Sequence, residues 1–250
     1  MQASRRLGSQ GPLVSAIGLG CWAIGGTAER NGKQHGWVDT DDAESARALR
    51  TALDMGITFL DTADVYGAGH SERLLGQILS PAQRAKLVIA TKFSKLFDEA
   101  KRLRLDDSMT DVSPAYVKSA VDASLRRLRT DWIDLFQLHD GKLPLDQVPQ
   151  LLDTLDSLVA AGKIRGYGWS TDDVARAEAF AAGTHCVAVQ HRMNLLEDAP
   201  AMRALCEAAG LASINRSPLA QGLLTGKFNA DTRFDATDLR AGWRLGEGAR

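Results

Sequence analysis

Four polar side chains of this 250-residue sequence have the types needed to move one proton. Tyr66 carries a hydroxyl whose ordinary pKa, about 10, makes it too weak an acid at neutral pH. A lysine ammonium beside it, here Lys92, would favour the phenolate and lower that pKa, and the carboxylate of Asp61 would hold the ammonium in place. His139 can donate a hydrogen bond to a carbonyl oxygen across the site. Such a set can protonate an oxygen that becomes negative during reduction.

These four residues come where short apolar stretches end. Asp61, Lys92 and His139 each close such a stretch, and Tyr66 follows Asp61 in the loop DTADVYG. Sites in parallel α/β folds are built at the carboxyl ends of the strands. Taken singly, each residue has a simpler interpretation as a helix cap, a packed ring or a structural histidine. Four of them on successive strand ends favour a catalytic site.

An alternation of strands and helices must position these side chains, because β-branched apolar runs are followed by stretches of helical period. Asp41 and Glu44 have capping-box spacing, and Ser113 precedes Pro114 as a helix start. The polar stretch 94–112 is long for a connection, which favours a functional loop. Strands are predicted at 13–22, 57–63, 87–93, 133–139, 163–170, 186–194 and 211–218. Helices are predicted at 41–56, 71–79, from Ser113 onward, and at 148–162, 172–183 and 202–210.

The strands are uniformly apolar, which is typical of a parallel sheet covered by helices on its faces. No linker interrupts the βα repeats, so we expect a single domain over residues 1–250. After residue 228 the chain is polar and no eighth strand is visible. A doubly wound sheet needs no eighth strand, whereas a closed (β/α)8 barrel does. Periodicity alone leaves both architectures open.

Composition excludes some classes of function. With 30 Lys and Arg against 31 Asp and Glu, the chain lacks the basic surplus of a nucleic-acid-binding protein. Its three cysteines form no CxxC motif, which indicates a reducing compartment, and no His/Cys cluster has zinc spacing. Arg5 and Arg6 precede an uncharged stretch, 7–28, that could be an export signal or a turn between two short strands. Glycines interrupt that stretch, so we expect the turn, no membrane helix and a cytoplasmic protein.

Six stretches, in order along nearly the whole chain, resemble aldo-keto reductases: SAIGLGCW, FLDTADVYGAGHSERLLG, VIATKF, SLRRLRTDWIDLFQLH, GKIRGYGWS and SPLAQGLLTGKF. The resemblance implies a (β/α)8 TIM barrel whose bottom is closed by an N-terminal hairpin. It implies reduction of a small aldehyde or ketone by hydride transfer from NADPH, with NADH as the other option. It assigns Tyr66 as the general acid, Lys92 and Asp61 as its tuning pair, and His139 as the group that orients the carbonyl.

The same resemblance implies a set of cofactor contacts. The first strand end would lie near the nicotinamide, two side chains would hold its carboxamide, and the loop after the seventh strand would wrap the pyrophosphate. Two positions depart from the family: Thr171 replaces an asparagine, and Arg216 replaces a ring that stacks on the nicotinamide, although a guanidinium can stack too. The contacts implied near the nicotinamide are Gly20, Cys21 and Trp22, and those implied at its carboxamide are Ser170 and Gln190. The contacts implied at the end of the seventh strand and in the loop after it are Arg216, Ser217, Leu219, Gln221, Gly222 and Leu224.

Nothing after Gly226 resembles the segment that in this family completes the barrel and binds the adenosine 2′-phosphate. The sequence therefore looks like the first three-quarters of a reductase, truncated at its C-terminus. Seven strands cannot close an eight-stranded barrel, so we expect open edges on the first and seventh strands, and such edges invite association. Two rival interpretations stay open: a cofactor-binding, redox-sensing subunit, and an inactive truncated product.

Overall fold

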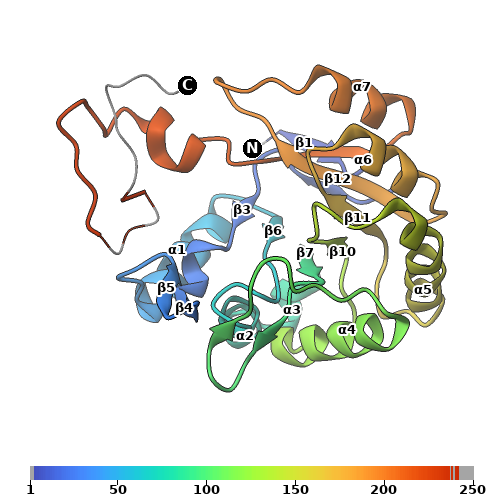
Figure 1. Ribbon diagram of the computed structural model, residues 1–250, viewed down its shortest axis with the longest axis horizontal. Helices are drawn as coiled ribbons and strands as arrows, with labels where there is room; N and C mark the ends of the chain where they lie inside the picture. The colour runs from blue at the N-terminus through green and yellow to red at the C-terminus, as the bar shows by residue number, and fades with distance from the viewer. Residues whose placement is uncertain (1–2, 237, 239, 242–250) are drawn as a thin grey trace.

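A seven-stranded parallel sheet forms the centre of the molecule (Figure 1), with strand order β13-β12-β11-β10-β7-β6-β3. This computed structural model describes residues 3–236, 238, 240 and 241. Six of the predicted strands are present as single elements, most of them shorter than expected, and the seventh, 13–22, is divided in two. Their bounds are β3 Leu19–Gly20, β6 Phe59–Asp61, β7 Val88–Phe93, β10 Leu135–Leu138, β11 Tyr167–Ser170, β12 Cys186–Arg192 and β13 Ala212–Arg216.

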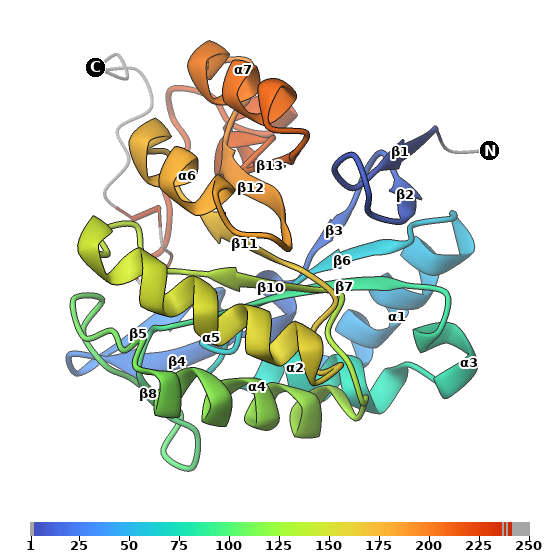
Figure 2. The ribbon, with the colours of Figure 1, turned by 90° about the vertical axis from the view of Figure 1, so that its right-hand side faces the viewer.

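Helices follow the successive strands and cover the outer face of the sheet (Figure 2). The predicted helix starts are confirmed, because Asp41 accepts a hydrogen bond from the Glu44 amide at 2.8 Å and Ser113 caps the helix that begins at Pro114. The short helix α3, Pro81–Arg84, was not predicted. The main helices are α1 Asp42–Asp54, α2 His70–Ile78, α4 Pro114–Leu128, α5 Val148–Ala160, α6 Val174–Ala181 and α7 Pro200–Ala208.

The N-terminal hairpin closes the bottom of the sheet, as expected. It consists of β1, Ser4–Arg6, and β2, Leu13–Ser15, which pair antiparallel. Its residues Leu7 and Val14 pack into an inner core with residues of β6, β7, β10 and β12. The predicted strand 13–22 is wrong as one element, because the chain leaves the hairpin after β2 and turns before β3 enters the main sheet. The hairpin contacts the segments before β6 and before β13, because the Ser15 amide donates to Thr58 Oγ1 at 2.8 Å and the Ser9 amide donates to the Gly210 carbonyl at 2.7 Å.

A second, four-stranded sheet lies beside the carboxyl ends of the main strands, with the order β5-β4-β9-β8. The stretch 94–112 is therefore not a structureless loop, because β8, Phe97–Asp98, and β9, Leu103–Arg104, belong to this sheet. β9 pairs with β4, Thr27–Arg30, which in turn pairs with β5, Lys33–Gly36. Strands of two to four residues are too short to show a readable alternation, so they could not be predicted from the sequence.

Both edge strands of the main sheet are open within the described part of the chain. Neither β3 nor β13 has a second neighbour there, and a cavity of about 1500 Å³ lies between them. The expectation of an eight-stranded barrel type with seven strands and two free edges is confirmed. Association through those edges stays a prediction, which sedimentation at rising protein concentration would check. In the described residues no helix has the length and apolar character needed to cross a membrane.

Candidate active site

Polar side chains replace apolar ones at the top of the inner core. Residues two apart on a strand face the same side, so each strand carries its inward positions from the apolar bottom to the cavity. The inner core includes Phe59, Ala90, Leu135 and Ala188, with Ile214 packed against it. Two positions further along each strand come Asp61, Lys92, Gln137, Gln190 and Arg216. This change from apolar to polar residues at the inward positions of five strands builds a polar floor under the cavity.

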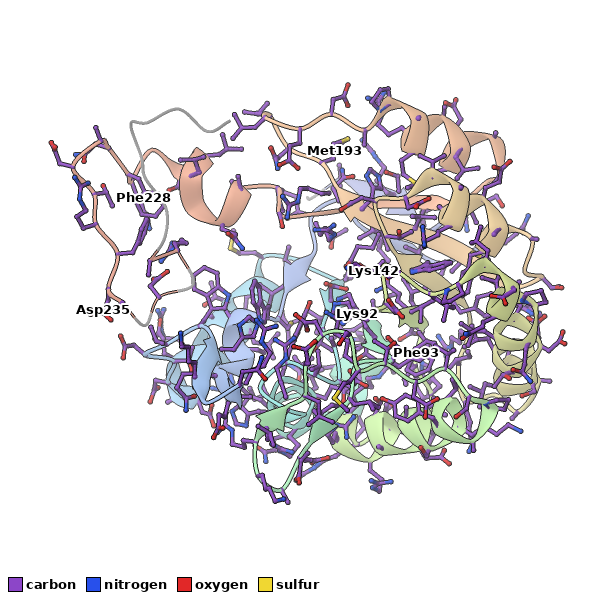
Figure 3. All side chains as sticks on the ribbon, viewed as in Figure 1. Lys92, Phe93, Lys142, Met193, Phe228 and Asp235 are labelled. Atoms are coloured by element: carbon purple, nitrogen blue, oxygen red, sulfur yellow. The ribbon has the colours of Figure 1, made fainter. Side chains whose placement is uncertain are left out.

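Lys92 lies at the centre of that floor and is completely buried (Figure 3). Its Nζ donates to both carboxylate oxygens of Asp61, at 2.9 and 2.8 Å, and to the carbonyl oxygen of Thr62 at 2.8 Å. The Tyr66 hydroxyl lies 3.4 Å from the same Nζ. Burial alone would lower the pKa of Lys92, but Asp61 and Tyr66 together raise it above its ordinary value. The ammonium is therefore held charged against the phenol.

Two glutamine amides complete the environment of Asp61. Gln190 donates to Asp61 Oδ1 at 2.9 Å, and Gln137 donates to the same oxygen at 3.3 Å. Sequence reasoning missed Gln137, although a glutamine inside a fully buried strand was a usable signal. These bonds hold the carboxylate toward Lys92.

The Tyr66 hydroxyl has a pKa above its ordinary value, which corrects the expectation of a net lowering. Burial raises the pKa most, the positive charge of Lys92 lowers it, and the negative charge of Asp61 raises it again. Lys92 therefore acts in the expected direction, but its effect is smaller than that of desolvation. Tyr66 stays protonated at neutral pH and is poised to donate.

His139 closes the other side of the site and is uncharged. Its ring and that of Tyr66 are 6.0 Å apart between centroids and nearly perpendicular, at 82°. Burial lowers the pKa of His139 well below its usual range, and the nearby cations Lys92, Lys95 and Arg104 lower it further. Its buried Nδ1 has no hydrogen-bond partner among the described residues. A neutral imidazole with one N–H can donate to a substrate oxygen without adding charge.

Close contact between two glycines fixes the loop that carries Tyr66. Gly67 has φ of +58°, and a Cβ there would lie 1.9 Å from the carbonyl oxygen of Gly25. Gly25 belongs to the short helix η1, Ala23–Gly25, and a Cβ on it would lie 3.2 Å from Tyr66 Cβ. A side chain at Gly67 would clash with the backbone of Gly25, and one at Gly25 would press on Tyr66, so the two glycines let the segments approach each other closely.

A buried ion pair supports this loop from below. Glu72 of α2 is fully buried and accepts from Arg127 Nε and from Thr91 Oγ1, each at 2.6 Å. Arg127 also donates to Glu99, at 2.9 Å. Sequence reasoning did not identify this pair, because its partners are 55 residues apart. It ties α2 to α4 directly behind the strand that carries Lys92.

The residues implied as cofactor contacts are brought together only in part. Cys21 is the clear exception, because its side chain is buried in the larger hydrophobic core between the sheet and its helices, called here the outer core. Its amide donates to the Asp61 carbonyl at 2.7 Å, and burial raises the pKa of its thiol to about 12. We therefore assign Cys21 to packing. Gly222 and Leu224 belong to the short helix η3, Ala220–Thr225, and do not line the cavity. Lys92 does not line it either, because its side chain is fully buried below the cavity floor. Those that line the cavity are Gly20, Trp22, Ser170, Gln190, Arg216, Ser217, Leu219 and Gln221.

The two departures from the family pattern have partners of their own. Arg216, at the end of β13, forms an ion pair with Asp172, which follows β11. The Thr171 hydroxyl accepts from the Asp173 amide at 3.1 Å, and its side chain is buried. Ser170 donates to the Gln190 side chain at 3.3 Å. Arg216 is thus held at the cavity edge by a carboxylate.

The chain after β13 turns sharply and folds back toward the site. Ala220, Gln221 and Gly222 have consecutive positive φ angles. Arg240 then donates to the Gln221 carbonyl at 3.3 Å and lies 5.1 Å from the centroid of the Trp37 ring. Figure 3 shows Phe228 in this segment, well away from Lys92.

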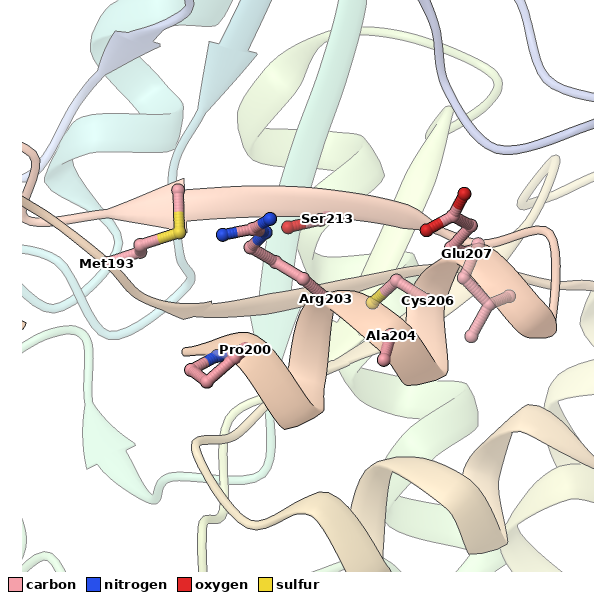
Figure 4. A pocket seen from close by; sticks show the side chains of 8 residues that line it. Met193, Pro200, Arg203, Ala204, Cys206, Glu207 and Ser213 are labelled. Atoms are coloured by element: carbon pink, nitrogen blue, oxygen red, sulfur yellow. The ribbon is translucent and has the colours of Figure 1, made fainter. Parts of the chain in front are cut away.

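A second hollow lies between α7 and the last two strands (Figure 4). Its volume is about 460 Å³, and Met193, Arg203 and Ser213 are among its lining residues. It contains none of the predicted site residues. No group of His, Cys, Asp and Glu that could hold a metal ion occurs in the described part of the chain.

Comparisons with known proteins identify the family of the chain. The family model described as "Aldo/keto reductase family" matches residues 16–244. Aldo-keto reductase YhdN of Bacillus subtilis is 34% identical over 236 residues, which are 91% of this chain and 65% of that protein. The NADH-specific methylglyoxal reductase of Escherichia coli is 30% identical, with 90% of this chain and 70% of that protein covered. The chain thus spans about two thirds of the length of these relatives.

Solved structures show the same relationship. The holo form of aldo-keto reductase AKR11C1 from Bacillus halodurans superposes with a TM-score of 0.79 at 29% identity, covering 94% of this chain and 73% of that one. Glycerol dehydrogenase AKR11B4 from Gluconobacter oxydans gives 0.77 at 33% identity, covering 95% and 70%. With the parallel sheet, the hairpin below it and the Asp61, Lys92 and Tyr66 contact above it, these matches lead to one conclusion: the chain belongs to the aldo/keto reductase family.

Proposed function

We propose that this protein reduces an aldehyde or ketone to an alcohol with NADPH or NADH, and that Tyr66 donates the proton. The observation that carries the proposal is the buried Lys92 ammonium, which contacts Asp61 and Tyr66 at once. A charged donor fixed beside the phenol stabilises negative charge that develops on the tyrosine as its proton leaves. The ammonium is positioned when the protein folds, so it does not have to be reoriented when the substrate binds.

His139 orients the substrate in this proposal. Its neutral ring stands nearly perpendicular to Tyr66, so two donors of different kinds can converge on one carbonyl oxygen. Trp22, whose ring centroid lies 6.1 Å from that of Tyr66, narrows the approach from the opposite side. A carbonyl held in this way needs little rearrangement before proton transfer.

The residues present fit a nicotinamide dinucleotide. The cavity runs from Trp22 and Tyr66 past Ser170 and Gln190 to the loop after β13, so one elongated ligand can reach all of them. Ser170 and Gln190 would hold the carboxamide, while Arg216, Ser217 and Gln221 would hold the ring and pyrophosphate. When bound, the reduced nicotinamide supplies the hydride.

The test is turnover of a reactive aldehyde by the purified chain. With NADPH or NADH and methylglyoxal or 4-nitrobenzaldehyde, we expect loss of the absorbance of the reduced cofactor and formation of the alcohol, identified by chromatography. Binding of NADPH without steady-state turnover would overturn the proposal in favour of a redox-sensing role. A failure of both binding and turnover would indicate an inactive product.

A further inference from the structure

A cluster of cations stands at the mouth of the site without enough acidic partners. Arg30 of β4, Lys95 after β7 and Arg104 of β9 all pair with a single carboxylate, that of Asp107. Lys95 Nζ lies 3.2 Å and Arg104 Nη2 lies 2.9 Å from Asp107 Oδ1. Three positive side chains sharing one negative one leave an excess of positive charge.

The other nearby carboxylates do not remove this excess. Asp106 accepts from the Ser108 amide and hydroxyl, at 3.0 and 2.7 Å, and from Asn31 at 3.5 Å. Asp140, which follows His139, accepts from Thr110 and from the Lys142 amide. Within the described residues, neither Asp106 nor Asp140 forms an ion pair with any of the three cations, so Asp107 is their single direct partner.

The cluster faces the candidate active site. Lys95, Arg104 and Asp107 line the same cavity as Tyr66 and His139. The proximity is also electrostatic, since Lys95 and Arg104 both help to depress the pKa of His139. These residues come from the small four-stranded sheet and from the segments next to it, after β7 and after β9.

Arg104 carries an unsatisfied hydrogen-bond donor within the described residues. Its side chain is only 8% exposed, and its buried Nε has no partner among the described residues, although Nη2 donates to Asp107. A buried guanidinium N–H without an acceptor destabilises the protein by the desolvation of that group. A ligand carboxylate can supply the missing acceptor, because its two oxygens can accept two parallel N–H bonds from one guanidinium.

We propose that Lys95 and Arg104 bind a carboxylate of the substrate, so that the preferred substrates are aldehydes and ketones carrying a carboxylate group. The inference rests on the proposed carbonyl reduction. The carbonyl lies at Tyr66 and His139, and the carboxylate lies at the cation cluster. The rings of Trp22 and Trp37, 5.9 Å apart between centroids, cover the apolar body between the two polar ends.

A matched pair of substrates tests this assignment. 4-Carboxybenzaldehyde and methyl 4-formylbenzoate present the same reacting group and differ in charge at the far end. We expect the parent protein to favour the carboxylate by about tenfold or more in kcat/KM, mainly through KM. Arg104→Gln and Lys95→Gln should each reduce this ratio severalfold and leave the rate with the ester within about twofold, because the ester has no charge to lose.

Two further variants separate charge from structure. Arg104→Lys retains the charge and should keep most of the preference. Lys101→Gln removes a lysine from the connection between β8 and β9, whose side chain is 75% exposed and paired with Asp98, and should leave the ratio unchanged. Equal preference for acid and ester in the parent protein would overturn the assignment. An equal fall of kcat/KM with the acid and with the ester in Arg104→Gln and Lys95→Gln would also overturn it.

A binding experiment keeps the test independent of turnover. Benzoate should quench the tryptophan fluorescence of the parent protein at lower concentration than benzamide does, and Arg104→Gln should abolish that difference. NADPH affinity should be unchanged in Arg104→Gln; a parallel loss would show that the cluster binds a cofactor phosphate and would overturn the assignment. If neither aldehyde is reduced, the proposed function fails, and the benzoate titration alone decides whether the anion site exists.

Discussion

The two walls of the cavity differ in how completely they are built. On one side, every residue of β7 and of β10 is buried, and helices α2, α4 and α5 contribute to the core behind them. On the other side, β13 alternates between half-buried and exposed residues and has no strand beyond it in the described chain. The first wall carries Lys92, with Tyr66 in the loop packed against it, and the second carries Arg216 and leads into the η3 loop.

In the proposed function, proton transfer belongs to the first wall and most of the cofactor binding to the second. The contact between Asp61 and Lys92 joins the neighbouring strands β6 and β7, so it does not depend on what lies beyond β13. The second wall presents its polar groups at an open edge, where fewer neighbours fix them. We therefore expect polar changes in the first wall to affect the chemical step, and polar changes in the second to affect cofactor binding.

Replacing Tyr66 should give the largest effect. Tyr66→Phe removes the proton donor and should lower aldehyde reduction by about 10² to 10⁴-fold at every pH, while NADPH affinity stays the same. Fluorescence titration and steady-state rates measure both. Tyr116→Phe, in the outer core, is the matched control and should change neither. Turnover of Tyr66→Phe within tenfold of the parent would exclude it as the sole donor.

The pair behind Tyr66 should show an unequal response. Lys92→Met removes the charge that lowers the pKa of Tyr66, so the pKa rises further and reduction should slow by roughly 10² or more. Asp61→Asn should slow it less, because Lys92 keeps its charge and its bond to the Thr62 carbonyl. Rates and the pH profile of each variant give the ranking, and a larger loss in Asp61→Asn would reverse it.

Two isoleucines test the difference in packing between the walls. Ile89 in β7 is completely buried, whereas Ile214 in β13 is partly exposed. Ile89→Ala should lower the free energy of unfolding by about 2–5 kcal/mol, and Ile214→Ala by less than about half as much. Urea unfolding measures both values. Equal losses would mean that the open wall is as well packed as the closed one.

The pH dependence should be the smallest effect. Tyr66 donates only while protonated, and burial has raised its pKa, so the rate should fall only when the pH rises above about 10. His139 is neutral because its pKa is well below the usual range, so it gains a proton only in acid. We expect a flat kcat/KM for a neutral aldehyde between about pH 6 and 9. A step near pH 6.5 would show that His139 titrates in its ordinary range.

The parts of the site that follow from the sequence are those with local signals. The apolar runs and the helical periods place Asp61, Lys92 and His139 at strand ends, and Asp41 and Ser113 mark helix starts by their own side chains. The strand order and the free edges were expected from the family resemblance, because the seven βα units alone left both a doubly wound sheet and a barrel open. The assignment of Tyr66 as a donor stays a prediction, supported by its contact with Lys92.

Tertiary structure alone decided the long-range contacts. Gln137 and Gln190 meet at Asp61 although they are 76 and 129 residues away from it, and Cys21 turns its thiol into the outer core. The cation cluster around Asp107 joins short strands that have no readable period, so neither its members nor its place beside Tyr66 could be predicted. Periodicity reports which face of an element is buried, and only the packed chain determines which side chains from distant elements share one cavity.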